Sequence, residues 1–222
     1  FVTEGLPPTA PTLRVDGITI NQDFGDKTLS YLNRIQNKGR TIEVLFDADW
    51  DAGHRRLSIN ALNLSFPDDD HVQFSAEIEG VDLSSRNNIL MSAGSLAITR
   101  TVTDIRSKRT FQDYLLQPLG FALLYRSDDP EARVAELKDV GRAYIAMVPD
   151  DILPQKSQAD LLSLLDQMPD PSGRLVIETT ATPGIGPARF ATLAMRRGGI
   201  TDPAQIFEAL RGLVLNITFE PL

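Results

Sequence analysis

The clearest pattern in the chain is an alternation of apolar and polar residues that starts at Thr41 and ends at Trp50. The even-numbered positions of this segment are all apolar, and Asp47 and Asp49 stand among the odd-numbered ones. Successive side chains of a strand point to opposite faces, so a period of two predicts a strand. We therefore expect one face of this strand to be apolar and the other to carry the acids.

Two further alternating segments follow at 57–66 and 72–78, and turn-forming residues precede each of them. In the first segment the apolar positions change from odd to even near Asn60, and a β-bulge there restores one common face. Short connections favour antiparallel neighbours. Residues 40–83 therefore predict a three-stranded antiparallel meander with one polar face.

Outside the meander, strand patterns alternate with helical ones. The other strands are expected at 12–20, 96–105, 174–180 and 213–219. Helices are expected from Asp26 to Gly39, at 111–119 with an interruption at Pro118, from Asp129 to Pro149, from Ser157 as N-cap to Met168, and from Pro187 and Pro203. Aspartate and serine cap helix N-termini, and proline fits the first helical position but not the interior.

These elements predict an α+β fold, in which antiparallel β-meanders form a curved sheet and helices pack on one face of it. At 222 residues, the chain is long enough for one sizeable hydrophobic core. We expect an N-terminal spacer over 1–11 and a single α+β domain over 12–222. Similar strand–helix segments recur 83 positions apart, so two similar lobes at 12–94 and 95–222 are an alternative within that domain.

Charge and composition exclude several partners. Asp and Glu outnumber Lys and Arg by 30 to 22, and the formal net charge of −8 repels nucleic acid and, at long range, anionic headgroups. We therefore expect no nucleic-acid partner. The lack of cysteine removes disulfides and thiolate chemistry. No apolar run approaches the ~18 residues of a transmembrane helix, so no transmembrane segment is expected.

The start of the chain fits export if a signal peptidase removed a leader, whereas a designed start or a disordered end would explain it as well. Its first residue is Phe1 rather than methionine, and the proline-rich stretch 4–11 is typical of a spacer between a removed leader and the first folded element. We therefore expect a periplasmic location.

Alternate acids at Asp47, Asp49 and Asp51 resemble the start of a calcium-binding loop. Counted from Asp47, such a loop needs glycine at its sixth position, where the chain has Ala52, and glutamate at its twelfth, where the chain has Ser58. On a strand the three acids share one face, so we interpret them as part of a solvated polar face. The consecutive acids at 68–70 fall on a turn and point in diverging directions, which favours solubility over cation binding.

The two histidines, His54 and His71, are expected beside turns at opposite ends of the middle strand of the meander. A metal site or a Ser-His-Asp relay requires side chains that converge. The dipeptide Gly94-Ser95 lacks the second glycine of a nucleophile elbow. We therefore assign no catalytic residue, no metal ligand and no cofactor.

Glycine and arginine clusters give weak signals for a ligand. The segment 184–189 follows a strand and opens a helix, so its N–H groups and Arg189 could hold an anion. Its glycine spacing matches neither a dinucleotide-binding nor a phosphate-binding loop, and we interpret it as a helix start. The pairs Arg55-Arg56 and Arg196-Arg197 are isolated in an acidic chain and make no nucleic-acid surface.

Several segments carry a resemblance to a known group of proteins. They are LRVDGITI at 13–20, LSINALNLS at 57–65, FSAEIEGV at 74–81, and GRLVI at 173–177 before a proline-rich helix start. In these segments the chain resembles uncharacterised exported proteins of α-proteobacteria, and its short strands are similar to those of AsmA-like envelope proteins. The resemblance implies a periplasmic location and a β-rich groove that shields lipid tails. It implies no catalytic residue.

Alternating strands without a catalytic cluster favour a non-enzymatic protein of the cell envelope that binds a lipid or another envelope protein. No ligand-binding residue is assigned, but a groove of this kind is expected to be bordered by Leu6 and the segment 111–124, including Phe121, Leu123 and Leu124, with Tyr125 beside it. The same side chains would otherwise form core. Two alternatives stay open: a cation-dependent hydrolase that uses Asp47 or Asp49, and a structural interaction domain.

Overall fold

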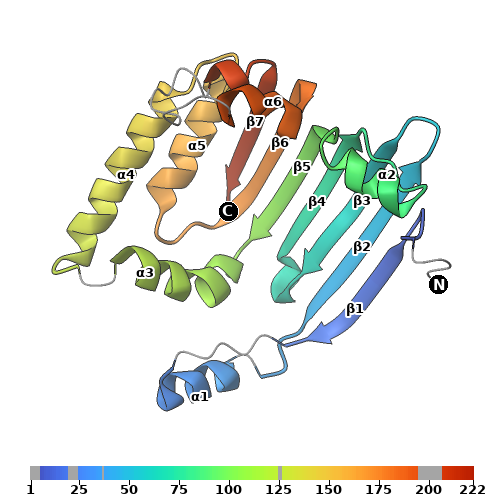
Figure 1. Ribbon diagram of the computed structural model, residues 1–222. Helices are drawn as coiled ribbons and strands as arrows, with labels where there is room; N and C mark the ends of the chain where they lie inside the picture. The colour runs from blue at the N-terminus through green and yellow to red at the C-terminus, as the bar shows by residue number, and fades with distance from the viewer. Residues whose placement is uncertain (1–5, 20–24, 37, 125–126, 195–206) are drawn as a thin grey trace.

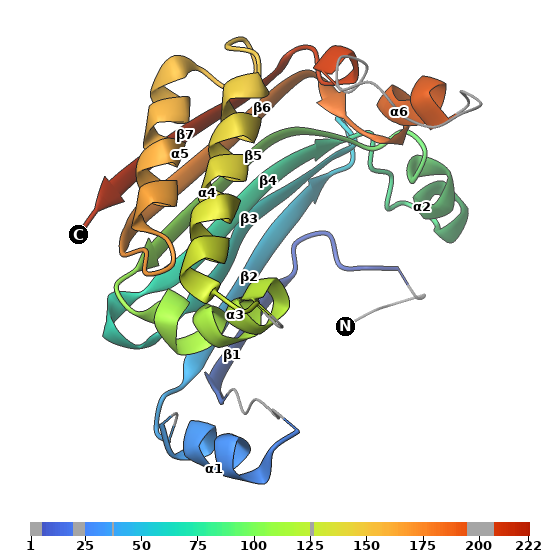
Figure 2. The ribbon, with the colours of Figure 1, turned by 90° about the vertical axis from the view of Figure 1, so that its left-hand side faces the viewer.

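The computed structural model describes residues 6–19, 25–36, 38–124, 127–194 and 207–222 (Figure 1). These residues form a seven-stranded antiparallel sheet, in which each strand pairs with its neighbours along the chain in the order β1 to β7. The sheet is curved and open, with helices beside it (Figure 2). The predicted α+β fold with a curved antiparallel sheet is confirmed.

The strands match the alternating segments closely. They are β1 (Thr12–Ile18), β2 (Ile42–Asp51), β3 (Arg56–Ser65), β4 (His71–Glu79), β5 (Ala97–Ser107), β6 (Gly173–Ile185) and β7 (Leu213–Pro221). The predicted meander consists of β2, β3 and β4. In β3, Asn60 is the extra residue where the register with β2 shifts, so the predicted bulge is confirmed.

The helices include two that aspartate caps as predicted. They are α1 (Lys27–Gln36), α2 (Arg86–Ser92), α3 (Leu116–Leu124), α4 (Pro130–Met147), α5 (Gln155–Gln167) and α6 (Pro187–Ala194), with a 3₁₀ turn η1 (Pro67–Asp69) and a π-helical turn η2 (Phe111–Leu115). Asp26 accepts hydrogen bonds from the N–H groups of Thr28 and Leu29, and Asp129 accepts one from Ala132. The helix expected from Pro203 begins outside the described residues.

The helices gather in three places around the sheet. Helices α4 and α5 stand beside β7, and α3 lies with them on one side of the sheet (Figure 2). Helices α1 and α3 lie at one end of the molecule, whereas α2 and α6 lie at the other end (Figure 1). The two ends are therefore far enough apart for variants to probe them separately.

The strand registers divide the sheet into an apolar and a polar face. Phe46 of β2 lies opposite Leu62 of β3, which in turn lies opposite Phe74 of β4, and these side chains continue one apolar row. The other face carries cross-strand ion pairs, such as Arg100 with Glu178 at 2.7 Å. This division follows directly from the period of two in the sequence.

The apolar face is covered most completely where α5 packs against β7. Ile152, between α4 and α5, is buried with Ala181 of β6 and Leu213 of β7. Ile217 and Phe219 of β7 are buried as well. In contrast, Phe46, Leu62 and Phe74 in the middle of the sheet are only half-buried.

Ser157 does not cap α5, contrary to the prediction. The helix starts two residues earlier, after Pro154, and the buried Ser157 hydroxyl instead accepts a hydrogen bond of 2.8 Å from the Ile217 N–H. The Leu215 N–H likewise donates to the Ile152 carbonyl, over 2.7 Å. Both N–H groups lie on the outer edge of β7, where no further strand pairs with them. Helix α5 and the residues before it therefore supply hydrogen-bond acceptors for this edge strand.

Pro118 does not interrupt its helix either. The chain forms the π-helical turn η2 first, and α3 then begins at Leu116, so that Pro118 lies in the first turn of α3. A third difference is α2, which lies in a segment expected to be a polar connection and is capped by Ser85.

The expected lobes share one sheet. The division between 94 and 95 falls in the connection between β4 and β5, and these two strands pair from His71 to Glu79. The spacer at 1–11 is described from Leu6 onward, where the carbonyls of Thr9 and Pro11 accept hydrogen bonds from Trp50 and Ala48. The division into domain and lobes stays a prediction.

Candidate functional site

The position of α3 is fixed by a buried carboxylate at the end of β5. Asp70, only 2% exposed, follows η1 and accepts hydrogen bonds from the N–H groups of Lys108, Arg109 and Thr110 at 2.8, 3.0 and 2.9 Å. The Thr110 hydroxyl donates a fourth hydrogen bond, at 2.7 Å. These donors lie where the chain leaves β5 and enters η2, so Asp70 determines the direction in which η2 and α3 leave the sheet.

Two further contacts hold η2 against the meander. The Arg40 guanidinium, just before β2, lies 2.7 Å from the nearly buried carboxylate of Asp113 in η2. The buried ring of Tyr114 lies 5.4 Å from the ring of Phe66, between centroids. Burial raises the pKa of Tyr114 above its ordinary value, so this phenol stays neutral. Charge pairing and aromatic packing thus attach the base of α3 to the sheet.

Helices α4 and α5 pack closely because glycine stands at their crossing. A Cβ atom at Gly141 would lie 3.1 Å from Leu165 Cδ2, closer than ordinary contact. Around this point, the Arg142 guanidinium lies 2.7 Å from the Asp166 carboxylate, and Lys138 Nζ donates to the Asp166 carbonyl over 2.9 Å. The pair is therefore a rigid wall that faces α3.

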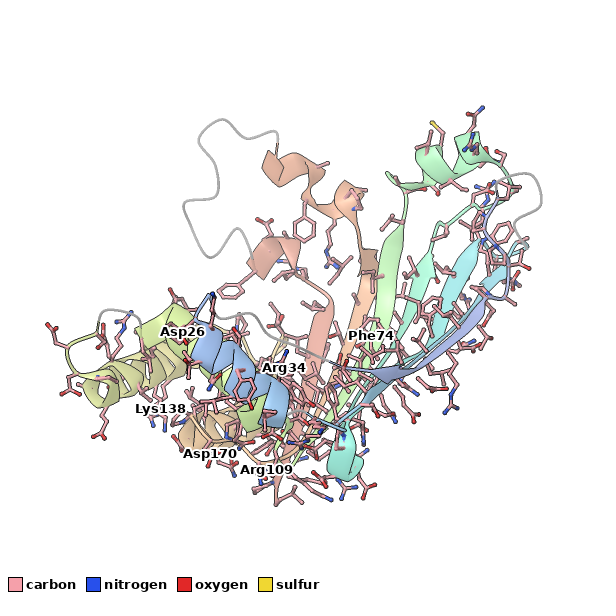
Figure 3. The ribbon with its side chains drawn as sticks, turned by 90° about the horizontal axis from the view of Figure 1, so that it is seen from below. Asp26, Arg34, Phe74, Arg109, Lys138 and Asp170 are labelled. Atoms are coloured by element: carbon pink, nitrogen blue, oxygen red, sulfur yellow. The ribbon has the colours of Figure 1, made fainter. Side chains whose placement is uncertain are left out.

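An apolar cavity of about 240 Å³ lies between these three helices, and we call it the α3–α5 pocket. It is lined by Phe111, Leu116, Leu119, Gly120, Leu123, Leu124, Val134, Leu137, Lys138, Leu165, Met168 and Pro169. A second hollow of about 410 Å³ shares several of these residues and includes Pro130 and Glu131 at the start of α4. Because the two hollows share five lining residues, we describe them together as one apolar groove, and Lys138, labelled in Figure 3, lines both of them.

Only some of the residues that the sequence predicts to border a groove line the α3–α5 pocket. Leu123 and Leu124 line the pocket, as does Phe111 at the start of the predicted segment. Leu6 and Phe121 are not among the lining residues, and Phe121 is exposed on another side of α3. Tyr125 lies outside the described residues.

The opposite wall, from α4 and α5, is missing from the sequence prediction. Val134 and Leu137 belong to the apolar stripe that the helical spacing of α4 reveals, but a stripe does not show whether it packs tightly or borders a space. Gly141 is the one local signal that could have been used, because glycine inside a helix often marks a close crossing. The depth of the pocket depends on tertiary packing alone.

The three alternate aspartates do not act as one group. Asp47 and Asp49 each accept a hydrogen bond from the Asn60 amide, at 3.0 and 2.8 Å, on the polar face of the sheet. Hydrogen bonds from Thr12 and Asn60 lower the pKa of Asp47. Asp51 instead holds the β2–β3 turn through the Gly53 and His54 N–H groups. Among the described residues, no group of three or more His, Asp or Glu side chains could hold a metal ion.

The histidines lie at opposite ends of β3, where the sequence places them. His54 Nδ1 is 2.7 Å from the Asp51 carboxylate in the exposed β2–β3 turn. His71 begins β4, and its Nε2 lies 3.9 Å from Asp104. The acids 68–70 have distinct environments, because Asp68 and Asp69 are exposed in η1 whereas Asp70 is buried.

The segment 184–189 is a packing feature of the sheet. The Arg189 guanidinium donates to the carbonyls of Pro183, Ala209 and Arg211, so its donors serve the fold. A Cβ at Gly186 would overlap the Leu96 carbonyl oxygen, which explains why glycine stands where the two segments approach so closely. Of the arginine pairs, Arg55 and Arg56 lie at the exposed β2–β3 turn, and 196–197 lie outside the described residues.

Comparison with known proteins finds no matching family model, no matching curated protein and no matching solved structure. Across the described parts of the chain, no helix combines the length and the apolar character needed to cross a membrane.

Proposed function

We propose that the protein is a non-enzymatic component of the cell envelope, which binds the hydrocarbon chain of a lipid in the α3–α5 pocket. The observation that carries this proposal is the lining of the pocket, which is apolar on every side except at Lys138. Ligand pockets typically combine apolar walls with few polar groups that fix the orientation of the ligand. The periplasmic location is part of the proposal and rests on the resemblance to exported proteins.

The shape and chemistry of the groove suit a chain with an anionic head. A cavity of about 240 Å³ that opens into a hollow of about 410 Å³ accommodates an elongated ligand better than a compact one. Each methylene group removed from water contributes about 0.8 kcal/mol to binding. Lys138 uses one of its three donors for the Asp166 carbonyl, and the others suit a carboxylate or phosphate headgroup.

The experiment that tests this function fills the pocket from Gly120. A Cβ at Gly120 would have no atom within 4 Å, so a larger side chain enters open space. We expect Gly120→Phe to weaken binding of cis-parinaric acid, a fluorescent C18 fatty acid, about 200-fold, since the ring displaces about four methylene groups at ~0.8 kcal/mol each. Fluorescence titration of the purified protein measures this change.

Gly120→Ala is the matched control. It adds one methyl group, leaves most of the cavity free and should bind the fatty acid as the unmodified protein does. Because alanine favours the helix over glycine, this variant should also be more stable by about 0.5 to 1 kcal/mol. Equal binding by the phenylalanine and alanine variants would place the ligand elsewhere and contradict the proposal.

The alternative functions have less support from the geometry. A cation-dependent hydrolase built on Asp47 and Asp49 needs carboxylates that are directed toward a common ion, but both accept hydrogen bonds from Asn60 on an open sheet face. A purely structural interaction domain does not account for an apolar cavity between well-packed helices. We therefore propose lipid-chain binding as the function.

A further inference from the structure

Helix α1 exposes the side that a helix of a soluble protein normally buries. Asn33 is 9% exposed, whereas Tyr31 and Leu32 are 53% and 54% exposed and Leu29 and Ile35 are similarly open. An amphipathic helix ordinarily directs its apolar stripe toward the core and its polar side toward water. In α1 the polar Asn33 faces the protein, and the apolar side faces outward.

The charges of α1 are arranged around this apolar side. At 100° per residue, Leu29, Leu32, Ile35 and Tyr31 occupy one arc of the helix, and Lys27 and Arg34 border it next to Tyr31. The Arg34 guanidinium lies 5.5 Å from the centre of the Tyr31 ring. Residues 26–39 contain Lys27, Arg34 and Lys38 against the single acid Asp26, in a chain whose net charge is −8. The helix is therefore a basic region on an acidic protein.

Helix α3 extends the same apolar end of the molecule. Its sequence, Leu116–Leu124, contains no charged residue, and Leu116, Leu119 and Leu123 are exposed although they also line the pocket. Figures 1 and 2 both place α1 and α3 at this end, with α1 set apart below α3. Seen from below, α1, marked by Asp26 and Arg34, covers part of α3 (Figure 3).

We propose that α1 and the exposed side of α3 form a docking surface for a lipid bilayer that contains anionic headgroups. Helices that lie in a membrane interface carry leucine and aromatic residues on the buried side and lysine or arginine beside them, as α1 does. The overall negative charge repels the rest of the chain from such a surface, which orients α1 toward it. The inference rests on the proposed function and extends it, because α3 is also one wall of the α3–α5 pocket. A membrane bound at α3 would therefore lie beside the opening of that pocket.

Sedimentation with lipid vesicles tests the docking surface. We expect the protein to bind vesicles of 30% phosphatidylglycerol in phosphatidylcholine, and to bind pure phosphatidylcholine far more weakly. Leu32→Asp should abolish binding, because it places a charge in the centre of the apolar arc. The double variant Lys27→Gln/Arg34→Gln should weaken binding to anionic vesicles about 30-fold, from roughly 5-fold for each basic residue near an anionic surface.

Matched controls lie at the other end of the molecule. Leu90 on α2 is 75% exposed, so Leu90→Asp makes the same change at an even more open helix position. Arg55→Gln/Arg56→Gln removes two exposed charges at the β2–β3 turn. Both controls should bind anionic vesicles as the unmodified protein does.

The outcomes separate this inference from the pocket itself. Vesicle binding that is absent, or that is unchanged by Leu32→Asp, overturns the docking surface. A change from dimer to monomer with Leu32→Asp in gel filtration, without vesicle binding, would instead assign the surface to a second copy and also overturns it. The Leu32→Asp variant should bind free cis-parinaric acid as the unmodified protein does. Weaker binding of cis-parinaric acid by the Gly120→Phe variant reports on the pocket alone.

Discussion

Asp70→Asn should lower the free energy of unfolding by about 3 kcal/mol at neutral pH. The carboxylate is buried and accepts four hydrogen bonds, three of them on one oxygen. An amide has one acceptor oxygen, so its NH₂ group would face at least one backbone donor and leave it unsatisfied, and the hydrogen bonds to its oxygen would lose the charge of the acceptor. A buried donor without a partner costs about 1 to 3 kcal/mol, and hydrogen bonds to charged groups contribute ~1.5 to 3 kcal/mol. Urea unfolding followed by the fluorescence of Trp50, the single tryptophan, measures the loss.

The effect of Asp70 should depend on pH. Burial acts to raise the pKa of this carboxyl, but hydrogen bonds from Arg109, Lys108 and Thr110 act more strongly, so the pKa lies below its ordinary value. A lowered pKa in the folded state stabilises the protein above the unfolded value of about 3.9. This contribution is lost as the pH falls through the folded pKa. The difference between Asp70→Asn and the unmodified protein should therefore shrink below about pH 4.

The neighbouring acid supplies the control. Asp69, whose side chain is 87% exposed, undergoes the same chemical change in Asp69→Asn, which should alter stability by less than about 0.5 kcal/mol. Equal effects of the two substitutions would show that Asp70 does not hold the β5–η2 junction.

Gly80→Ala should destabilise the fold by about 3 kcal/mol through two separate causes. Gly80 follows β4 with a φ of +74°, which costs a residue with a Cβ atom about 1 to 2 kcal/mol. The added Cβ would also overlap the Ser95 carbonyl oxygen, and overpacking of this kind costs ~1 to 3 kcal/mol. Because Trp50 Nε1 donates to the Val81 carbonyl, one residue away, its fluorescence should also report a local change.

Gly39→Ala separates the two causes. Gly39 has a similar φ of +81°, but no atom would lie within 4 Å of its Cβ. We expect a loss of about 1 kcal/mol from backbone strain alone. If both alanine variants lose the same stability, the contact with Ser95 contributes nothing and two separate causes are not needed.

Local sequence rules were sufficient for most of the fold. The period of two located the meander and the phase change near Asn60 located its bulge, because both depend on neighbouring residues. Ser157 shows where such rules fail. Its position favours an N-cap, but its hydroxyl satisfies the Ile217 N–H, sixty positions away, which only tertiary structure brings near.

The candidate site could be predicted only in part, for a similar reason. The apolar segment that contains Leu123 and Leu124 predicts one border of a groove, but the α4–α5 wall depends on the crossing at Gly141. The periodicity of α1 shows that Leu29 and Leu32 share a side. The periodicity does not show that this side faces away from the protein, since the orientation of α1 relative to the sheet depends on tertiary structure.

The central claim is that a hydrocarbon chain occupies the α3–α5 pocket, and paramagnetic broadening in NMR spectra tests it most directly. If the chain binds there, 16-doxyl-stearic acid should broaden the methyl signals of Leu123, Leu137 and Leu165, which line the pocket. Gly120→Phe should restore these signals. Broadening confined to Leu62 and Leu64 on the apolar face of the sheet, with the pocket signals unchanged, would contradict the claim.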